Sequence, residues 1–168
     1  MSLPFAIMGL VTLQRLAELI IAQSNTRGLM ARGAIEIGRG HYPAMVSMHA
    51  AWLIALWLCA GGQSVNVVLL GIFALLQALR IWVLATLGRS WTTRIIVLPG
   101  AELVTGGPFR FLRHPNYCVV VGEIAVLPLV FGLTWIAAVF TVLNAAMLWV
   151  RIGAESRALY SLPVAAKG

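Results

Sequence analysis

Charged residues are scarce in this sequence, and aspartate is absent altogether. Only 10% of the 168 residues are charged, whereas 61% are hydrophobic, and the mean hydropathy is +0.93. Because soluble domains are about a quarter charged, this chain has too few polar side chains to cover a surface that faces water. The composition excludes an ordinary soluble domain and indicates an integral membrane protein, with a length that suits one domain over residues 1–168.

Negatively charged residues are scarcer than positively charged ones. Five glutamates stand against twelve basic residues, which gives a net charge of +7. In a soluble protein this excess would suggest nucleic acid. Here the arginines stand singly between apolar runs, without a basic helix face or stacking aromatic residues beside them. We therefore expect no nucleic-acid partner and attribute the basic residues to membrane topology.

Cysteine and histidine are also few, which limits thiol and metal chemistry. Cys59 and Cys118 each lie in or beside an apolar run, so two buried free thiols are favoured over a disulfide. His41 and His49 are separated by eight positions and by Pro43, unlike the close pair of a helical metal site. Interfacial histidines are favoured over a metal site, and a role in lining a substrate entrance stays open.

Long apolar runs are what the sequence has instead. A helix needs about 20 mostly apolar residues to cross about 30 Å of hydrocarbon. A closed β-barrel is disfavoured because these runs are continuous rather than alternating. The fourth run is short and is joined to the fifth through a tight turn at Gly132, which predicts a helical hairpin. The expected transmembrane helices of this all-α protein are residues 3–22, 44–60, 65–87, 116–131 and 133–152.

Basic residues are distributed unequally among the loops. The connections at 61–64 and at Gly132 contain no lysine or arginine, whereas the other two connections and the C-terminal end hold ten. Because cytosolic loops carry the positive charge, we expect the N-terminus outside and the C-terminus in the cytosol. The ten residues are Arg27, Arg32, Arg39, Arg89, Arg94, Arg110, Arg113, Arg151, Arg157 and Lys167.

Several side chains inside the expected spans are costly in lipid and need partners. Structural pairing is favoured for Arg15 with Glu18, whereas for Arg80 with Glu123 pairing and a functional role are equally open. On the last helix, Asn144, Arg151 and Glu155 are spaced seven and four residues apart and share one stripe. An inward-facing site near the cytosolic end of the bundle is therefore expected. The six tryptophans are expected mostly to face lipid or the membrane interface.

A dense polar segment runs into the fourth span and ends at Tyr117. Pro115 is placed to begin a helix, because no N–H is lost in the first turn. The free N–H groups there, with Arg113 and His114, favour an anionic ligand, and Tyr117 offers a ring face or a hydroxyl. A basic membrane anchor would have the same composition, so both alternatives stay open on these residues alone.

At these residues the chain resembles the isoprenylcysteine carboxyl methyltransferase family of membrane enzymes. The similarity covers about residues 100–160, and Ala101, Phe109 and Ser156 depart from the family pattern of His, Tyr and Glu. The upstream segment from Glu36 to His49 is similar to the short bacterial branch, some members of which methylate alkylpyrone or alkylresorcinol hydroxyls. The matching pieces are Leu103-Val104-Thr105-x-Gly107-x-Phe109, Arg113-His114-Pro115-x-Tyr117, the hairpin, and Arg151-Ile152-x-x-Glu155 with Leu159.

The resemblance implies an S-adenosylmethionine-dependent O-methyltransferase that acts on a lipophilic acceptor, either a prenylcysteine-type carboxylate or an alkylpyrone or alkylresorcinol hydroxyl. It also implies a cofactor loop over about 88–115, an active site on the cytosolic side of a bacterial inner (plasma) membrane, and membrane lipids as surroundings. The expected site comprises cofactor-binding Leu103, Val104, His114, Tyr117 and Glu123, substrate-binding Arg80, His41 and Asn144, catalytic Arg151 and Glu155, and no metal ligand.

Two other functions stay open on the sequence. A membrane reductase of the sterol-reductase type, using NADPH, carries a similar Arg-His-Pro-x-Tyr string, although more spans would be expected. A noncatalytic small membrane protein would need its buried charges only as structural pairs. The common soluble methyltransferase architecture is excluded, because the chain has no glycine-rich nucleotide-binding fingerprint.

Cysteine accessibility tests the expected orientation. In a background of Cys59→Ser and Cys118→Ser, a membrane-impermeant thiol reagent should label Gln63→Cys in intact cells. The same reagent should label Arg110→Cys only after the membrane is permeabilised, because that position lies in a basic, cytosolic loop. Labelling of both positions from the same side would contradict the arrangement of five spans with an outer N-terminus.

Overall fold

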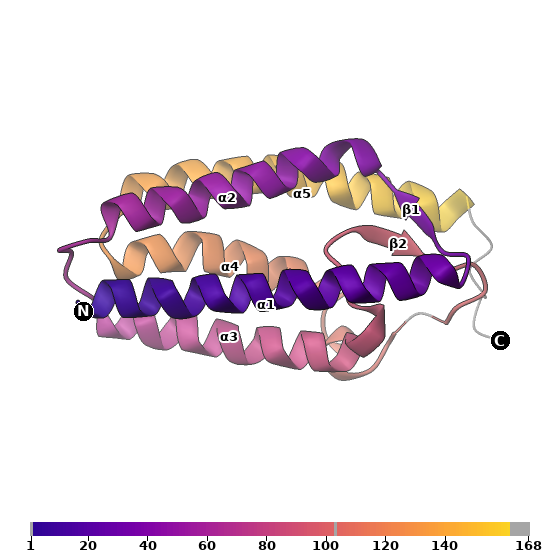
Figure 1. Cartoon of the computed structure of the whole chain (residues 1–168), viewed down its shortest axis with the longest axis horizontal. Helices are drawn as coiled ribbons and strands as arrows, with labels where there is room; N and C mark the ends of the chain where they lie inside the picture. The colour runs from indigo at the N-terminus through magenta and orange to yellow at the C-terminus, as the bar shows by residue number, and fades with distance from the viewer. Residues whose placement is uncertain (1, 103, 162–168) are drawn as a thin grey trace.

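The computed structural model describes residues 2–102 and 104–161, with backbone alone for 158–161, and is dominated by five helices that run along one axis (Figure 1). This largely helical, apolar bundle confirms the expected all-α membrane protein. The helices are α1 (Leu3–Ala31), α2 (Tyr42–Cys59), α3 (Val67–Leu87), α4 (Pro115–Val130) and α5 (Thr134–Ser161).

Helix α4 differs from the other four, which are long and apolar enough to cross a membrane. Its 16 residues rise only about 24 Å, less than the hydrocarbon thickness of about 30 Å. It contacts α3 and α5, and residues along its whole length are buried. A helix enclosed by its neighbours need not present a full span to lipid, and the five-span count and the orientation stay predictions.

Two helices extend beyond the spans expected from hydropathy. The first was expected to end at residue 22 but continues to Ala31, and the last continues from 152 to Ser161. Hydropathy marks where lipid contact ends, whereas a helix ends where its backbone hydrogen bonds stop. The extension of α1 is held by Asn25, whose Nδ2 donates to the carbonyls of Gly88 (3.1 Å) and Trp91 (2.8 Å).

The two long connections, 32–41 and 88–114, meet at one end of the bundle, which we call the loop end. There β1 (Ile35–Ile37) pairs antiparallel with β2 (Ile95–Val97), a small sheet that the sequence did not predict. Three short 3₁₀ helices complete this end, and the opposite end has only short turns. They are η1 (Arg39–His41), η2 (Gly88–Ser90) and η3 (Gly107–Arg110).

The apolar core lies toward the end opposite the loop end, and all five helices contribute to it. Trp52, for example, is 3% exposed within it, and Trp91 at the loop end is equally buried. The expectation that tryptophans face lipid is therefore wrong for these two, because their large rings fill space between helices. It is consistent with the exposed side chains of Trp57, Trp82, Trp135 and Trp149.

Charged side chains replace the apolar core nearer the loop end. Arg80 of α3 contacts Glu18 of α1 (2.6 Å) and Glu123 of α4 (2.7 Å). Arg15 of α1 contacts the same two carboxylates, at 3.0 and 2.9 Å. The expected Arg15–Glu18 and Arg80–Glu123 pairs are thus present, and the cross pairs join them into one network. Gln77 adds a hydrogen bond to Glu123 (2.7 Å).

This network predicts a large loss of stability when its central member is removed. In Arg80→Met, Glu18 and Glu123 keep only the partly exposed Arg15 as a cationic partner. Breaking a buried ion pair typically costs about 3–5 kcal/mol. We expect a clearly lowered unfolding temperature in detergent, whereas Arg89→Met, at an exposed position on η2, should change it little. Equal melting of the two variants would contradict the structural role of the network.

Candidate active site

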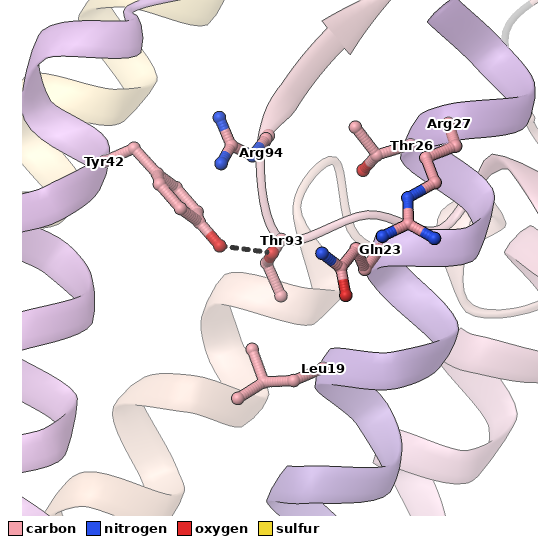
Figure 2. Close-up of a pocket in the computed structure, with 7 residues that line it drawn as sticks. All are labelled: Leu19, Gln23, Thr26, Arg27, Tyr42, Thr93 and Arg94. Atoms are coloured by element: carbon pink, nitrogen blue, oxygen red, sulfur yellow. Dashed lines mark hydrogen bonds between the residues drawn. The ribbon is translucent and has the colours of Figure 1, made fainter.

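A cavity of about 330 Å³ opens at the loop end between α1 and the start of α2 (Figure 2). Tyr42 projects into it from α2, and Thr93 and Arg94 close it from the segment before β2. The Tyr42 hydroxyl lies 3.0 Å from Thr93 Oγ1, which joins α2 to that segment. The α1 side is lined by Leu19, Gln23, Thr26 and Arg27.

The cavity carries positive charge. Arg94 lies 4.2 Å from the centre of the Tyr42 ring and pairs with Glu36 of β1 (2.5 Å), which also binds Arg39. Burial raises the pKa of the Glu36 carboxyl, but hydrogen bonds from the two arginines outweigh it and hold that pKa below its ordinary 4.5. Among the described residues, Arg27 has no ion-pair partner. The lining therefore favours an anionic or acidic group.

Arg151 is hydrogen-bonded to Thr93, one of the residues that line this cavity, and is only 6% exposed. Its Nη2 donates to the Thr93 carbonyl (3.1 Å), and its Nη1 contacts the Met45 sulfur (2.8 Å). No described carboxylate pairs with it. A buried guanidinium without an acidic partner is costly, and an anionic ligand would offset that cost.

Tyr117 and Glu155 join the start of α4 to the end of α5. The Tyr117 hydroxyl donates to Glu155 Oε2 (2.8 Å), and the His114 ring stacks on Tyr117 with 5.3 Å between centroids. Pro115 occupies the first turn of α4, as its position in the sequence predicted. Glu155 lies one turn from Arg151 on α5. Residues predicted for cofactor and acceptor therefore lie next to one another.

Asn144 lies two turns deeper than Arg151 on the same helix. It is 1% exposed, and neither polar atom of its amide has a hydrogen-bond partner among the described residues. Buried amides are normally satisfied, so an unpartnered one indicates a missing ligand or water. Asn144 and Arg151 thus share one stripe along α5, as their spacing predicted. Among the described residues the Asn144 side chain has no hydrogen-bond partner and Arg151 has no carboxylate partner.

The remaining predicted site residues are not gathered in one place. Arg80 and Glu123 belong to the charge network and do not line the cavity. His41 lies near Arg151 and packs over Gly38, where a Cβ would overlap its ring. Val104 is half-buried in the loop, and Leu103 lies outside the described residues.

Sequence reasoning missed most of the cavity lining. On α1 the lining residues lie four, seven and eight positions after Leu19, which is one helical face. That signal was available, but the expected helix ended at residue 22 and hid it. Thr93 and Arg94 had no recognisable pattern, because they reach the cavity only through the pairing of β1 with β2.

The sequence is similar to one known family and to two bacterial proteins. The profile of the isoprenylcysteine carboxyl methyltransferase family matches residues 67–161, which comprise α3 to α5 and the long loop. The uncharacterized protein YpbQ of Bacillus subtilis (strain 168) is 37% identical over 163 residues, or 94% of this chain and 97% of that protein. An uncharacterized protein of Haemophilus influenzae is 28% identical over 154 residues, or 88% and 90%. No solved structure matches the chain.

Proposed function

Because the chain belongs to the isoprenylcysteine carboxyl methyltransferase family and is thus a membrane methyltransferase, we propose that it methylates an oxygen of a lipophilic acceptor with S-adenosylmethionine. The observation that carries this proposal is the buried, unpaired Arg151. It shares Thr93 with the cavity and lies one turn from the Tyr117–Glu155 pair. A group bound in the cavity and a group bound at Tyr117 would meet beside this guanidinium.

The residues at the start of α4 fit the proposed methyl donor, which carries an adenine ring, a carboxylate and two cationic groups. The stacked rings of His114 and Tyr117 offer π-faces to a ring or a cation. By the resemblance, Val104 and Leu103 of the loop would also contact the donor. When bound, S-adenosylmethionine supplies an electrophilic methyl group on a sulfonium. The protein contributes positioning and the exclusion of water.

Arg80 and Glu123 enter this proposal as positioning residues rather than as direct ligands. The oxygens of Glu123 are already bound by Arg15, Arg80 and Gln77. Glu123 lies about two turns below Tyr117 on α4, so the network sets the depth and rotation of the helix that carries Tyr117. Loss of this network would disturb the site without removing a contact to either substrate.

The acceptor side of the proposal rests on Arg151 and Asn144. A guanidinium orients an anionic oxygen, and the unpartnered Asn144 amide can accept and donate hydrogen bonds. A carboxylate acceptor is already ionised and needs no base. A pyrone or phenol hydroxyl must lose a proton, for which Glu155 and a histidine are the available groups. The apolar tail would leave the cavity beside Leu19, which is largely exposed on α1.

The family match favours this proposal over the two alternatives left open by the sequence. A reductase would need to bind NADPH, and a noncatalytic protein would bind neither cofactor. The unpaired Arg151 also argues against a purely structural role for the buried charges, because structure alone would be served better by a paired or apolar side chain.

Cofactor binding gives the first test of this proposal. Purified protein in detergent should bind S-adenosylmethionine and S-adenosylhomocysteine in a calorimetric titration. His114→Ala and Tyr117→Ala should each weaken binding about ten- to a hundredfold, the usual loss for one good contact to a charged ligand. Tyr117→Phe, which keeps the ring, should lose less than Tyr117→Ala. Arg89→Ala is the control. If both alanine variants bind the cofactor as tightly as this control, the segment that ends at Tyr117 would be a basic membrane anchor instead.

A second test separates acceptor residues from cofactor residues. Arg151→Gln and Glu155→Gln should bind S-adenosylmethionine nearly as the unmodified protein does, yet lose most methyl transfer to the acceptor. Transfer to a hydroxyl should rise with pH until the base or the acceptor is ionised, whereas transfer to a carboxylate should be flat near neutrality. Full activity in both variants would overturn the assignment, and loss of cofactor binding in both would move them to the cofactor site.

A further inference from the structure

His49 on α2 is a half-buried imidazole that no part of the proposed site yet uses. Its Nδ1 lies 2.9 Å from the Met45 carbonyl, one turn earlier on the helix. A carbonyl oxygen only accepts hydrogen bonds, so Nδ1 carries the proton of the neutral ring and Nε2 keeps a lone pair. No described residue occupies Nε2. The fold therefore holds this imidazole in the tautomer that a base requires.

The pairing of α1 with α2 sets the level of His49 relative to the cavity. Trp57 Nε1 of α2 donates to Thr12 Oγ1 of α1 (3.0 Å), which sets the register of these antiparallel helices. About two turns toward the loop end, His49 on α2 and Leu19 on α1 lie at the same level. Leu19 is the deepest α1 residue that lines the cavity.

The charges around His49 come from three other helices. Arg15 of α1, Arg80 of α3 and Arg151 of α5 are all close enough to act on the ring electrostatically. The first two are neutralised by Glu18 and Glu123, as described above. Arg151 is not neutralised, so it remains the free positive charge near this imidazole. Such an arrangement stabilises an oxyanion that forms between Arg151 and His49.

Glu155 is less suited to the same task. Its carboxylate already accepts a hydrogen bond from the Tyr117 hydroxyl, so one of its oxygens is engaged. His49 instead lies one turn beyond Met45 on α2, and the Met45 sulfur contacts Arg151. Glu155 thus neighbours Arg151 on α5 itself, whereas His49 belongs to the facing helix α2.

We propose, on the basis of the function proposed above, that His49 is the base that deprotonates a hydroxyl acceptor. The O–H bond breaks and its proton moves to Nε2 of His49, while Arg151 faces the oxygen. The oxygen lone pair forms the new O–CH₃ bond as the C–S bond of the sulfonium donor breaks, and the electron pair of that bond stays on sulfur. His49 then returns its proton to water through the cavity.

His49→Asn isolates the base from the fold. The asparagine amide can still donate to the Met45 carbonyl, but it has no group equivalent to Nε2. We expect transfer to an alkylresorcinol to fall about 10²–10⁴-fold at neutral pH, the usual contribution of a general base. The loss should shrink toward high pH, and it should be smaller for an alkyl-substituted nitrophenol, which ionises without help. Added imidazole should restore part of the activity in His49→Gly.

Binding measurements supply a readout that does not depend on turnover. The bound nitrophenol should show the absorbance of its anion at a lower pH in the unmodified protein than in His49→Asn. Ser47→Ala, on an exposed position of the same helix, should match the unmodified protein in every assay. His49→Asn should also retain its affinity for S-adenosylmethionine, which would exclude a general loss of folding.

The outcomes separate this inference from the function on which it rests. Failure of the unmodified protein to bind S-adenosylmethionine would overturn the proposed function. Suppose that the unmodified protein binds S-adenosylmethionine and methylates hydroxyl acceptors. If His49→Asn then loses activity equally at all pH values and for both acceptors, only the role of His49 as the base would be overturned. Methylation of a prenylated cysteine carboxylate, but of neither hydroxyl acceptor, would likewise overturn that role, because an ionised carboxylate needs no base.

Discussion

Two arginines and two glutamates that meet between three helices impose the constraint on which the rest of the structure depends. In a bilayer no water is available to solvate an unpaired charge, so Arg15, Glu18, Arg80 and Glu123 must be brought together. This requirement fixes the depth and rotation of α1, α3 and α4 relative to one another. The described part of α5, in contrast, holds the buried Arg151 without a carboxylate partner.

Two buried arginines differ in whether the fold supplies a carboxylate partner. Arg80 and Arg151 are similarly buried, at 7% and 6% exposed. Arg80 has two carboxylates, whereas Arg151 has a backbone carbonyl and a sulfur. Burial alone would not distinguish them. The absence of a carboxylate partner for Arg151 among the described residues does, because a buried guanidinium without one is costly.

The two long connections act as one unit. The pairing of β1 with β2 brings Glu36 to Arg94, and Arg94 in turn covers the ring of Tyr42. Thr93, beside Arg94, bonds Tyr42 through its hydroxyl and Arg151 through its carbonyl. The cavity wall formed by Thr93 and Arg94, and the hydrogen bond from Arg151 to Thr93, therefore both depend on the position of β2. A change in this strand pairing would alter both the cavity and the orientation of Arg151.

The sequence by itself determined the membrane class, the approximate helices, the start of α4 at Pro115 and the family, because hydropathy and motif spacing are local properties. It also predicted the stripe of Asn144 and Arg151, since helical spacing is local as well. Only the tertiary structure decided that Arg80 also binds Glu18, that Thr93 and Arg94 reach Tyr42, and that Arg151 stays unpaired. Those features depend on which helix faces and loops meet, and such contacts join residues that lie tens of positions apart in the chain.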